Sequence, residues 1–154
     1  MSKVVENYII MEEAGKGKYS TVHKGRHITT GEVVAVKIIK LDAISDNPEI
    51  QDMISEELQA LRAVESPYIV KHLRYLRTTN NMYEVYEFYE GGDLSVLIQT
   101  EKCLPTHKAL KLFKDLVKAI KVLYENSIIH RDIQPENIFL QQDRAVLGDF
   151  GNCK

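Results

Sequence analysis

The sequence predicts an α+β protein in which an antiparallel sheet precedes a mostly helical region. Three observations support this class. Short apolar segments alternate with turn residues near the N-terminus, one helical repeat of apolar residues interrupts the strands, and a longer helical repeat follows them. This order predicts five antiparallel strands with one inserted helix, and then helices. We expect two lobes, at residues 8–90 and 91–154.

The first three predicted strands form a meander. The apolar segments are Tyr8–Met11, Thr21–Ile28 and Glu32–Leu41. Gly15–Gly17 separates the first two segments, and Thr29–Gly31 joins the second to the third. The pattern therefore predicts neighbouring strands connected by short turns.

An inserted helix follows these strands. Asn47–Glu49 combines a capping Asn, a Pro at the first helical position and an acid in the first turn. Apolar residues then recur at helical spacing until Ser66-Pro67. These apolar residues are Ile50, Met53, Ile54, Leu58, Leu61 and Val64. Two further strands are predicted at Ile69–Leu76 and Met82–Phe88, on either side of Thr78–Asn81.

The second lobe is predicted to be mainly helical. Asp93 is expected to cap a short helix, and Thr106 a longer helix that ends near Asn126. The apolar residues of the longer helix form one stripe, and its lysines lie mostly off it on a solvated face. The stripe comprises Ala109, Leu112, Phe113, Leu116, Val117, Ile120, Leu123 and Tyr124.

The composition restricts the class of protein. A hydrophobic fraction of 44% and a charged fraction of 27% are typical of a globular domain. The net charge of −2 gives no electrostatic reason to expect nucleic acid or membrane as a partner. Met1–Glu6 lacks the apolar core of a secretory signal, and Cys103 and Cys153 are too few for a disulfide framework. We therefore expect a cytoplasmic protein.

A glycine-rich segment between two predicted strands is the first candidate site. Gly15, Lys16 and Gly17 precede the small Ser20, and glycines let backbone N–H groups approach an anion closely. A dinucleotide-binding loop requires a helix next, whereas Thr21–His23 is predicted to be extended. An ordinary glycine hairpin remains the alternative.

A strand lysine and a helix glutamate form the second candidate. Ala35 and Lys37 share one face of their strand, so a flat ring can lie beside Ala35 while Lys37 reaches phosphates. Glu57 lies within the apolar stripe of the inserted helix, where a carboxylate requires a cationic partner. Lys37 is the natural candidate partner. The alternatives are a solvated lysine and a glutamate at the edge of the stripe that reaches water.

Two polar segments near the C-terminus supply further candidates. Asp132 and Asn137 lie in one loop, and the short strand Ile138–Leu140 anchors it. An acid and an amide five residues apart suit a proton acceptor and a metal ligand. Asp149–Gly151 follows another short strand, Ala145–Leu147, and adds a second carboxylate for a metal. Taken singly, either polar segment is also compatible with an ordinary turn.

These features occur in a characteristic order. A glycine loop, a strand lysine, a helix glutamate, a His-Arg-Asp triplet with a downstream Asn, and Asp-Phe-Gly follow one another. Over residues 8–154 the chain therefore resembles the protein kinase family. Pro135–Asn137, after Asp132, resembles the serine/threonine class. The resemblance implies a bilobal kinase fold whose helical C-lobe is incomplete and ends just after Asp-Phe-Gly.

The resemblance implies transfer of the γ-phosphoryl group of ATP to a Ser or Thr hydroxyl of a protein substrate, with Mg²⁺. In such kinases Lys37 would contact the phosphates and pair with Glu57. Asp132 would orient the substrate hydroxyl and accept its proton. Asn137 and Asp149 would hold Mg²⁺.

A nucleotide pocket is implied by the same resemblance. Val22 and Ala35 would lie above the adenine ring and Phe139 below it. The hinge would be Glu87–Tyr89, and Tyr86 at the gatekeeper position implies a small rear pocket. The implied nucleotide-binding residues are Gly15, Lys16, Gly17, Ser20, Val22, Ala35, Lys37, Glu87, Tyr89 and Phe139.

Two departures from the family pattern have consequences. Gln134 occupies the place of a catalytic Lys, and losing a charge-assisted contact costs about 1.5–3 kcal/mol, or roughly 10- to 150-fold in rate. The sequence also stops at Lys154, so the long helix and the catalytic loop are expected to expose apolar surface. A nucleotide-binding pseudokinase-like docking module and an inactive truncated fragment are the alternatives to an active enzyme.

Overall fold

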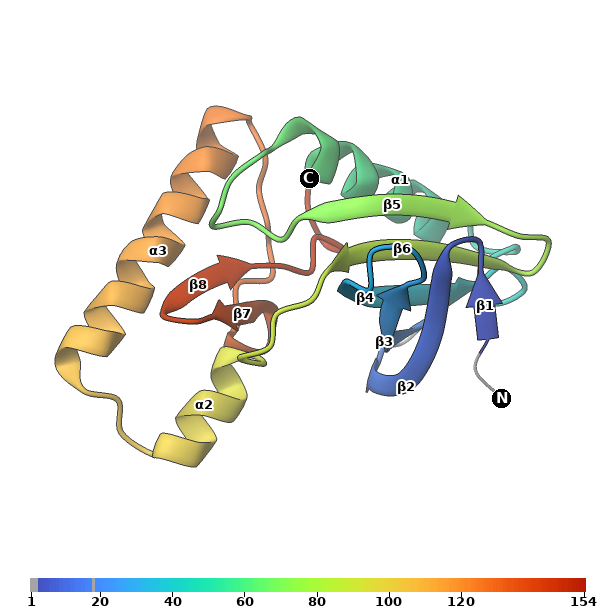
Figure 1. Cartoon of the computed structure of the whole chain (residues 1–154). Coiled ribbons are helices and arrows are strands. Elements are labelled where there is room, and N and C mark those ends of the chain that lie inside the picture. Colours follow the sequence, from blue (N-terminus) through green and yellow to red (C-terminus); the bar gives the residue numbers. More distant parts are fainter. Residues whose placement is uncertain (1–2, 18) are drawn as a thin grey trace. The chain divides into compact units, whose positions relative to one another are not determined.

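A computed structural model describes residues 3–17 and 19–154, which form eight strands, three α-helices and one 3-10 helix (Figure 1). The strands are β1 (Lys3–Val5), β2 (Tyr8–Lys16), β3 (Ser20–His27), β4 (Val33–Lys40), β5 (His72–Arg77), β6 (Asn81–Glu87), β7 (Ile138–Gln141) and β8 (Arg144–Leu147). The helices are α1 (Pro48–Ala63), α2 (Leu94–Glu101), α3 (Thr106–Glu125) and the 3-10 helix η1 (Pro135–Asn137). The α+β class is confirmed.

The chain divides into two compact units. The first contains the described residues of Met1–Gln51 together with His72–Phe88, and the second contains Asp52–Lys71 and Tyr89–Lys154. The division falls within α1. The lobe boundary expected between residues 90 and 91 stays a prediction.

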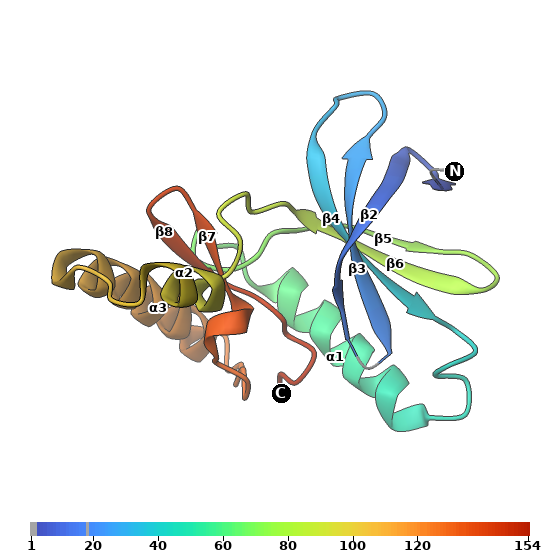
Figure 2. The ribbon, with the colours of Figure 1, turned by 90° about the horizontal axis from the view of Figure 1, so that it is seen from below.

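The first unit contains a six-stranded antiparallel sheet in the order β1-β2-β3-β4-β6-β5. The prediction of five strands was wrong, because β1 pairs with β2 through Lys3↔Ile10 and Val5↔Tyr8. Three residues are too few to show an alternating pattern, so the sequence did not reveal this strand. Figure 2 shows how strongly β2, β3 and β4 twist relative to β5 and β6.

Backbone pairing also changed two predicted boundaries. β2 continues to Lys16 because its polar second half still pairs with β3, through register shifts after Ile10. β5 begins only at His72, since Ile69 instead bridges to Leu147 in the second unit. Apolar character in the sequence shows neither that the polar second half of β2 pairs with β3 nor that the apolar Ile69 pairs outside the sheet.

One face of the sheet forms the core of the first unit. Val34 and Val36 point to this face, so Ala35 and Lys37 lie on the opposite face, as the period of two predicts. The core residues are Val5, Tyr8, Ile10, Val34, Val36, Leu76, Tyr83 and Val85. The opposite face is therefore the one that carries the candidate lysine.

The second unit is built from α3 against the β7–β8 hairpin, with α2 beside β7 (Figure 1). Asp93 caps α2 as predicted, because its Oδ1 accepts the Val96 N–H at 3.0 Å. The predicted Thr106 cap was wrong. Thr106 is itself the first helical residue, and Pro105 precedes it without a side-chain cap.

α3 is buried along one narrow side. Leu112, Ala119 and Leu123 are buried, whereas Phe113 is 63% and Tyr124 83% exposed. The predicted apolar stripe is wider than the surface that α3 packs against, and the expected exposure of apolar residues is confirmed. Within residues 3–17 and 19–154, no helix has both the length and the apolar character required to span a membrane.

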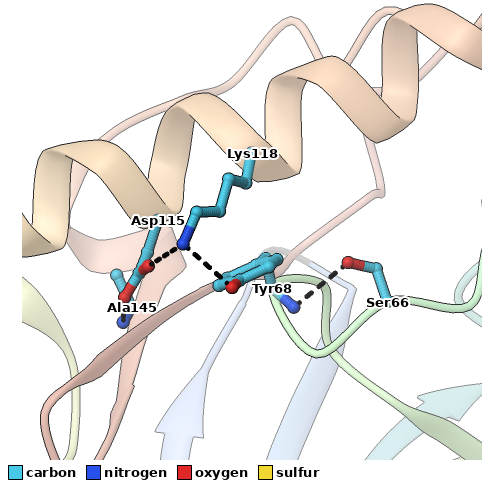
Figure 3. A network of polar contacts seen from close by, with 5 residues as sticks. All are labelled: Ser66, Tyr68, Asp115, Lys118 and Ala145. Carbon is cyan, nitrogen blue, oxygen red and sulfur yellow. Dashed lines mark hydrogen bonds and ion pairs between the residues drawn. The ribbon is translucent and has the colours of Figure 1, made fainter.

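A polar network attaches α3 to the segment after α1 (Figure 3). Lys118 Nζ donates to the Tyr68 hydroxyl at 3.0 Å and lies 3.2 Å from Asp115 Oδ1. The hydrogen bonds with Tyr68 and Asp115 raise the pKa of Lys118. Asp115 Oδ2 accepts the Ala145 N–H, and Ser66 Oγ accepts the Tyr68 N–H. The network joins three segments of the second unit that are far apart in the sequence.

Truncation of Leu76 should destabilise the first unit. Leu76 is 7% exposed, so Leu76→Ala is expected to lower the free energy of unfolding by about 2–5 kcal/mol through lost burial and a residual cavity. Leu73→Ala is the matched control, because Leu73 lies on the same strand and is 41% exposed. Chemical denaturation measures both variants, and equal losses would contradict the assignment of the core face.

Candidate functional site

Strand register aligns several predicted residues in one row across the sheet. The paired positions are Gly15↔Val22, Val22↔Lys37 and Lys37↔Glu84. Side chains of directly paired residues lie on the same face of a sheet. Val22 and Lys37 therefore share a face with Ala35, opposite the apolar core.

The glycine-rich segment forms the end of the β2–β3 hairpin. Lys16 pairs with Thr21, and the Gly17 N–H donates to the Ser20 carbonyl at 2.8 Å. Residue 18, inside the predicted segment, lies outside the described residues. β3 begins at Ser20, so a strand and not a helix follows the glycines. The hairpin brings Gly15, Lys16, Gly17 and Ser20 together.

Lys37 faces an acid that sequence reasoning missed. Its Nζ lies 3.5 Å from Glu84 Oε2, and the Glu84 side chain is fully buried. The Tyr86 hydroxyl donates to the same oxygen at 2.9 Å. The available signal was an acid between Tyr83 and Val85 in a central apolar strand, but its partner depended on the register of β4 and β6.

Glu57 is 2% exposed, so the prediction that it faces inward is confirmed. A Cβ placed on Gly151 would lie 3.7 Å from Glu57 Oε2 and 3.3 Å from Asp149 Oδ1. Burial, and next the Glu57 carboxylate, raise the pKa of the Cys153 thiol. Glu57 therefore lies beside the Asp-Phe-Gly segment within the second unit. Its pairing with Lys37, which belongs to the first unit, stays a prediction.

The predicted hinge residues have contacts within each unit. Glu87 ends β6 opposite Val34 in the first unit. In the second unit the Tyr89 ring stacks on Phe139 with centroids 5.9 Å apart, and the Tyr89 hydroxyl accepts the Lys71 N–H at 3.1 Å. The structure thus brings Tyr89 and Phe139 together.

Asp132, the predicted proton acceptor, and Asn137, a predicted metal ligand, are joined by hydrogen bonds. Asn137 Nδ2 donates to the Asp132 carbonyl at 3.0 Å and to its carboxylate Oδ2 at 3.1 Å. Asn137 ends η1 and is buried, and its backbone N–H donates to the Gln134 carbonyl. Gln134 itself is exposed. The spacing of five residues therefore places Asp132 and Asn137 side by side.

The Asp-Phe-Gly segment lies against this loop. The Gly148 N–H donates to the Asn137 carbonyl at 2.8 Å, which places Asp149 on a segment adjoining Asn137. Asn152 Nδ2 donates to Asp132 Oδ2 at 3.2 Å. Sequence reasoning missed Asn152, because nothing in its local pattern indicates a contact with a residue twenty positions away. The oxygen donors of Asn137 and Asp149 have the chemistry that Mg²⁺ prefers.

Arg131 connects the loop that carries Asp132 to the residues that follow Asp-Phe-Gly. It has a left-handed backbone with φ of 66°, which is unfavourable for a residue with a Cβ. Its side chain donates to the carbonyls of Asn152 and Cys153 at 2.5 and 3.2 Å. Ile129 and Lys154 exchange two backbone hydrogen bonds nearby. These bonds hold the unusual conformation in place next to Asp132.

His130 connects the same segments from the interior. It is 3% exposed, its Nε2 lies 2.9 Å from the Gly148 carbonyl, and its Nδ1 accepts the Asp132 N–H at 3.3 Å. A proton on Nε2 alone satisfies both bonds, so this geometry requires a neutral ring. Burial lowers the pKa of His130, against the opposing effect of the Gly148 carbonyl. The ring also packs edge-on against Phe150.

The arrangement has a defined chemical capacity. In the first unit, an ammonium group lies on a sheet face that carries small side chains and a glycine hairpin. In the second unit, the Asp132 carboxylate accepts hydrogen bonds from the side-chain amides of Asn137 and Asn152, and the Gly148 N–H, immediately before Asp149, donates to the Asn137 carbonyl. The ammonium group of the first unit has the chemistry to bind a phosphate, and the oxygen atoms of the second unit have the chemistry to accept a proton or to ligate a cation.

Comparison with known proteins identifies the related family. Residues 8–154 match the protein kinase domain. The chain is 31% identical over 153 residues to "Serine/threonine-protein kinase ATG1c" of Arabidopsis thaliana, a match that covers 97% of this chain and 21% of that protein. It is 33% identical over 155 residues to "Hormonally up-regulated neu tumor-associated kinase homolog A" of Xenopus laevis, covering 99% and 22%. The chain thus spans about a fifth of the length of these relatives.

The neutral His130 should make stability depend on pH. Its folded pKa lies below the ordinary value of 6.5, so the unfolded state binds a proton at higher pH than the folded state. The stabilising contribution is complete above pH 6.5 and is lost as pH falls through the folded pKa. His130→Gln is therefore expected to reduce the fall in melting temperature between about pH 7.5 and about pH 5.

The control is His107→Gln, which removes an exposed imidazole from α3 and should keep the wild-type slope. An unchanged slope in His130→Gln would contradict the requirement for a neutral ring. Thermal melts followed by circular dichroism at several pH values provide the measurement.

Proposed function

Because the chain belongs to the protein kinase family, we propose that it transfers the γ-phosphoryl group of ATP to a serine or threonine hydroxyl of a protein substrate in the cytoplasm. One observation carries the proposal. The Asp132 carboxylate is oriented by Asn137, and Asn137 is bonded through its backbone to the segment that holds Asp149. The names of the related proteins support the serine/threonine class.

Asp132 is proposed to act as the proton acceptor. The substrate hydroxyl passes its proton to the carboxylate while the hydroxyl oxygen attacks the γ-phosphorus, and ADP leaves. Two amide N–H groups, from Asn137 and Asn152, bind Asp132 Oδ2. They leave Oδ1 as the oxygen that can face the substrate.

Asn137 and Asp149 are proposed to hold Mg²⁺. The Asn137 amide nitrogen points at Asp132, so its oxygen is the atom that can ligate a cation. The Asp149 residue is exposed, and Mg²⁺ sites often combine one or two carboxylates with substrate phosphates. When bound, Mg²⁺ offsets the charge of the phosphates.

The sheet of the first unit is proposed to hold the nucleotide. Lys37 would contact the phosphates under the hairpin that contains Gly15 and Gly17. Val22 and Ala35 share the Lys37 face of the sheet, which supports their proposed contact with adenine. The resemblance to protein kinases further implies nucleotide contacts for the hinge Glu87–Tyr89 and for Phe139, which stacks on Tyr89 in the second unit.

A second candidate is a nucleotide-binding module that acts by docking without turnover. Gln134 favours it, because the side chain at this position carries no positive charge for the transferring phosphate. Both candidates bind Mg²⁺-ATP, so phosphoryl transfer distinguishes them.

Loss of the proposed proton acceptor should slow phosphoryl transfer strongly. Asp132→Asn is expected to reduce phosphoryl transfer at least about 100-fold and to leave Mg²⁺-ATP affinity within about twofold. Transfer from γ-labelled ATP to a generic protein substrate measures the rate, and calorimetry measures affinity. Asp143→Asn, an exposed acid in the β7–β8 turn, is the matched control. A wild-type rate of phosphoryl transfer in Asp132→Asn would contradict the proposed role of Asp132.

Restoring a lysine should accelerate the reaction. Gln134→Lys adds a charge-assisted contact worth about 1.5–3 kcal/mol, so the rate is expected to rise roughly 10- to 150-fold. Gln99→Lys adds the same charge on exposed α2 and should leave the rate unchanged. If neither wild type nor Gln134→Lys transfers phosphate while both bind Mg²⁺-ATP, the docking module is the correct function.

A further inference from the structure

We propose that Glu84 is a positioning residue for Lys37, which it anchors to the sheet so that the ammonium group meets the nucleotide phosphates. The inference rests on the proposed function, since Lys37 is the phosphate contact there. Glu84 lies directly opposite Lys37 in the β4–β6 pairing, with Oε2 3.5 Å from Nζ. It is therefore a charged partner that the sheet itself provides.

The burial of Glu84 makes this partnership obligatory. The Glu84 side chain is 0% exposed, whereas that of Lys37 keeps 18% exposure. A buried carboxylate is unstable without a cation and hydrogen-bond donors. Lys37 supplies the cation, and the Tyr86 hydroxyl donates to Oε2 at 2.9 Å. Tyr86 thereby holds the carboxylate toward the lysine.

Fold stability alone does not account for an acid at this position. Replacing a buried ion pair with apolar side chains of similar volume is often neutral or stabilising. The neighbouring residues Tyr83 and Val85 point to an apolar core that is complete without Glu84. The charge of Glu84 is better explained by its attraction for the Lys37 ammonium group, which it positions.

The number of donors on Lys37 permits a shared arrangement. An ammonium group has three N–H donors. One can bind Glu84, which leaves donors for the phosphates and for the predicted contact with Glu57. Glu84 and Lys37 lie on adjacent strands of one unit, so this anchor does not depend on the placement of α1.

Calorimetric titration of the full chain with Mg²⁺-ATP tests the proposal. Glu84→Gln keeps the shape and an oxygen acceptor for Tyr86, and Glu84→Leu removes both charge and acceptor. Each variant is expected to weaken binding about tenfold. Removing one partner of a buried ion pair is destabilising, so the titrations are carried out well below the melting temperature of each variant. Glu32→Gln is the matched control, because it removes an exposed acid from the β3–β4 turn and should change affinity less than twofold.

A Lys37→Met background separates positioning from a direct effect. If Glu84 acts through Lys37, then Glu84→Gln should cause no further loss in Lys37→Met. NMR of protein labelled with ¹⁵N-lysine gives a readout without nucleotide. The Lys37 ammonium should show slowly exchanging protons that disappear in Glu84→Gln and persist in Glu32→Gln.

The outcomes separate the two proposals. Wild-type affinity in both Glu84 variants, or an equal loss in the Lys37→Met background, overturns the role of Glu84 and leaves the proposed function intact. Absence of a protected Lys37 ammonium signal overturns the anchoring contact. If the wild-type chain does not bind Mg²⁺-ATP, the proposed function fails and the role of Glu84 fails with it.

Discussion

A buried and neutral His130 joins the two segments on which the proposed chemistry depends. Its Nε2 binds the Gly148 carbonyl, immediately before Asp149, and its Nδ1 accepts the backbone N–H of Asp132. One side chain thus sets the positions of two acids that are separated in sequence. Arg131 donates hydrogen bonds to the carbonyls of Asn152 and Cys153 on the exposed side. The loop that carries Asp132 is therefore hydrogen-bonded on both its buried and its exposed side.

In the first unit, the backbone pairing of strands fixes the relative positions of the candidate side chains. The register of two strand pairs, β3–β4 and β4–β6, places Val22, Lys37 and Glu84 in one row, and no loop is needed to orient them. The opposite face is packed with Val36, Val85 and their neighbours, which makes the sheet a rigid support. A lysine on such a support loses little further side-chain freedom on meeting a ligand, particularly where Glu84 already restrains it.

α3 illustrates how packing differs from periodicity. Leu112, Ala119 and Leu123 are buried, and hydrogen bonds of Lys118 with Tyr68 and of Asp115 with Ala145 attach the same helix to two other segments. Phe113 and Tyr124 belong to the same predicted apolar stripe, yet they remain exposed. A helical period identifies the apolar side of a helix, whereas the amount of that side that is buried depends on the width of the surface beneath it.

The sequence by itself determined the α+β class, the inserted helix, the inward direction of Glu57 and the shared face of Ala35 and Lys37. These follow from local periods and spacings, which nearby residues encode. Tertiary structure alone decided the sixth strand β1 and the start of α3 without a side-chain cap before Thr106. It also decided that Lys37 contacts Glu84, that Asp132 contacts Asn152 and that His130 contacts Gly148. Strand register and long-range hydrogen bonds join residues far apart in the chain, and no local pattern specifies such partners.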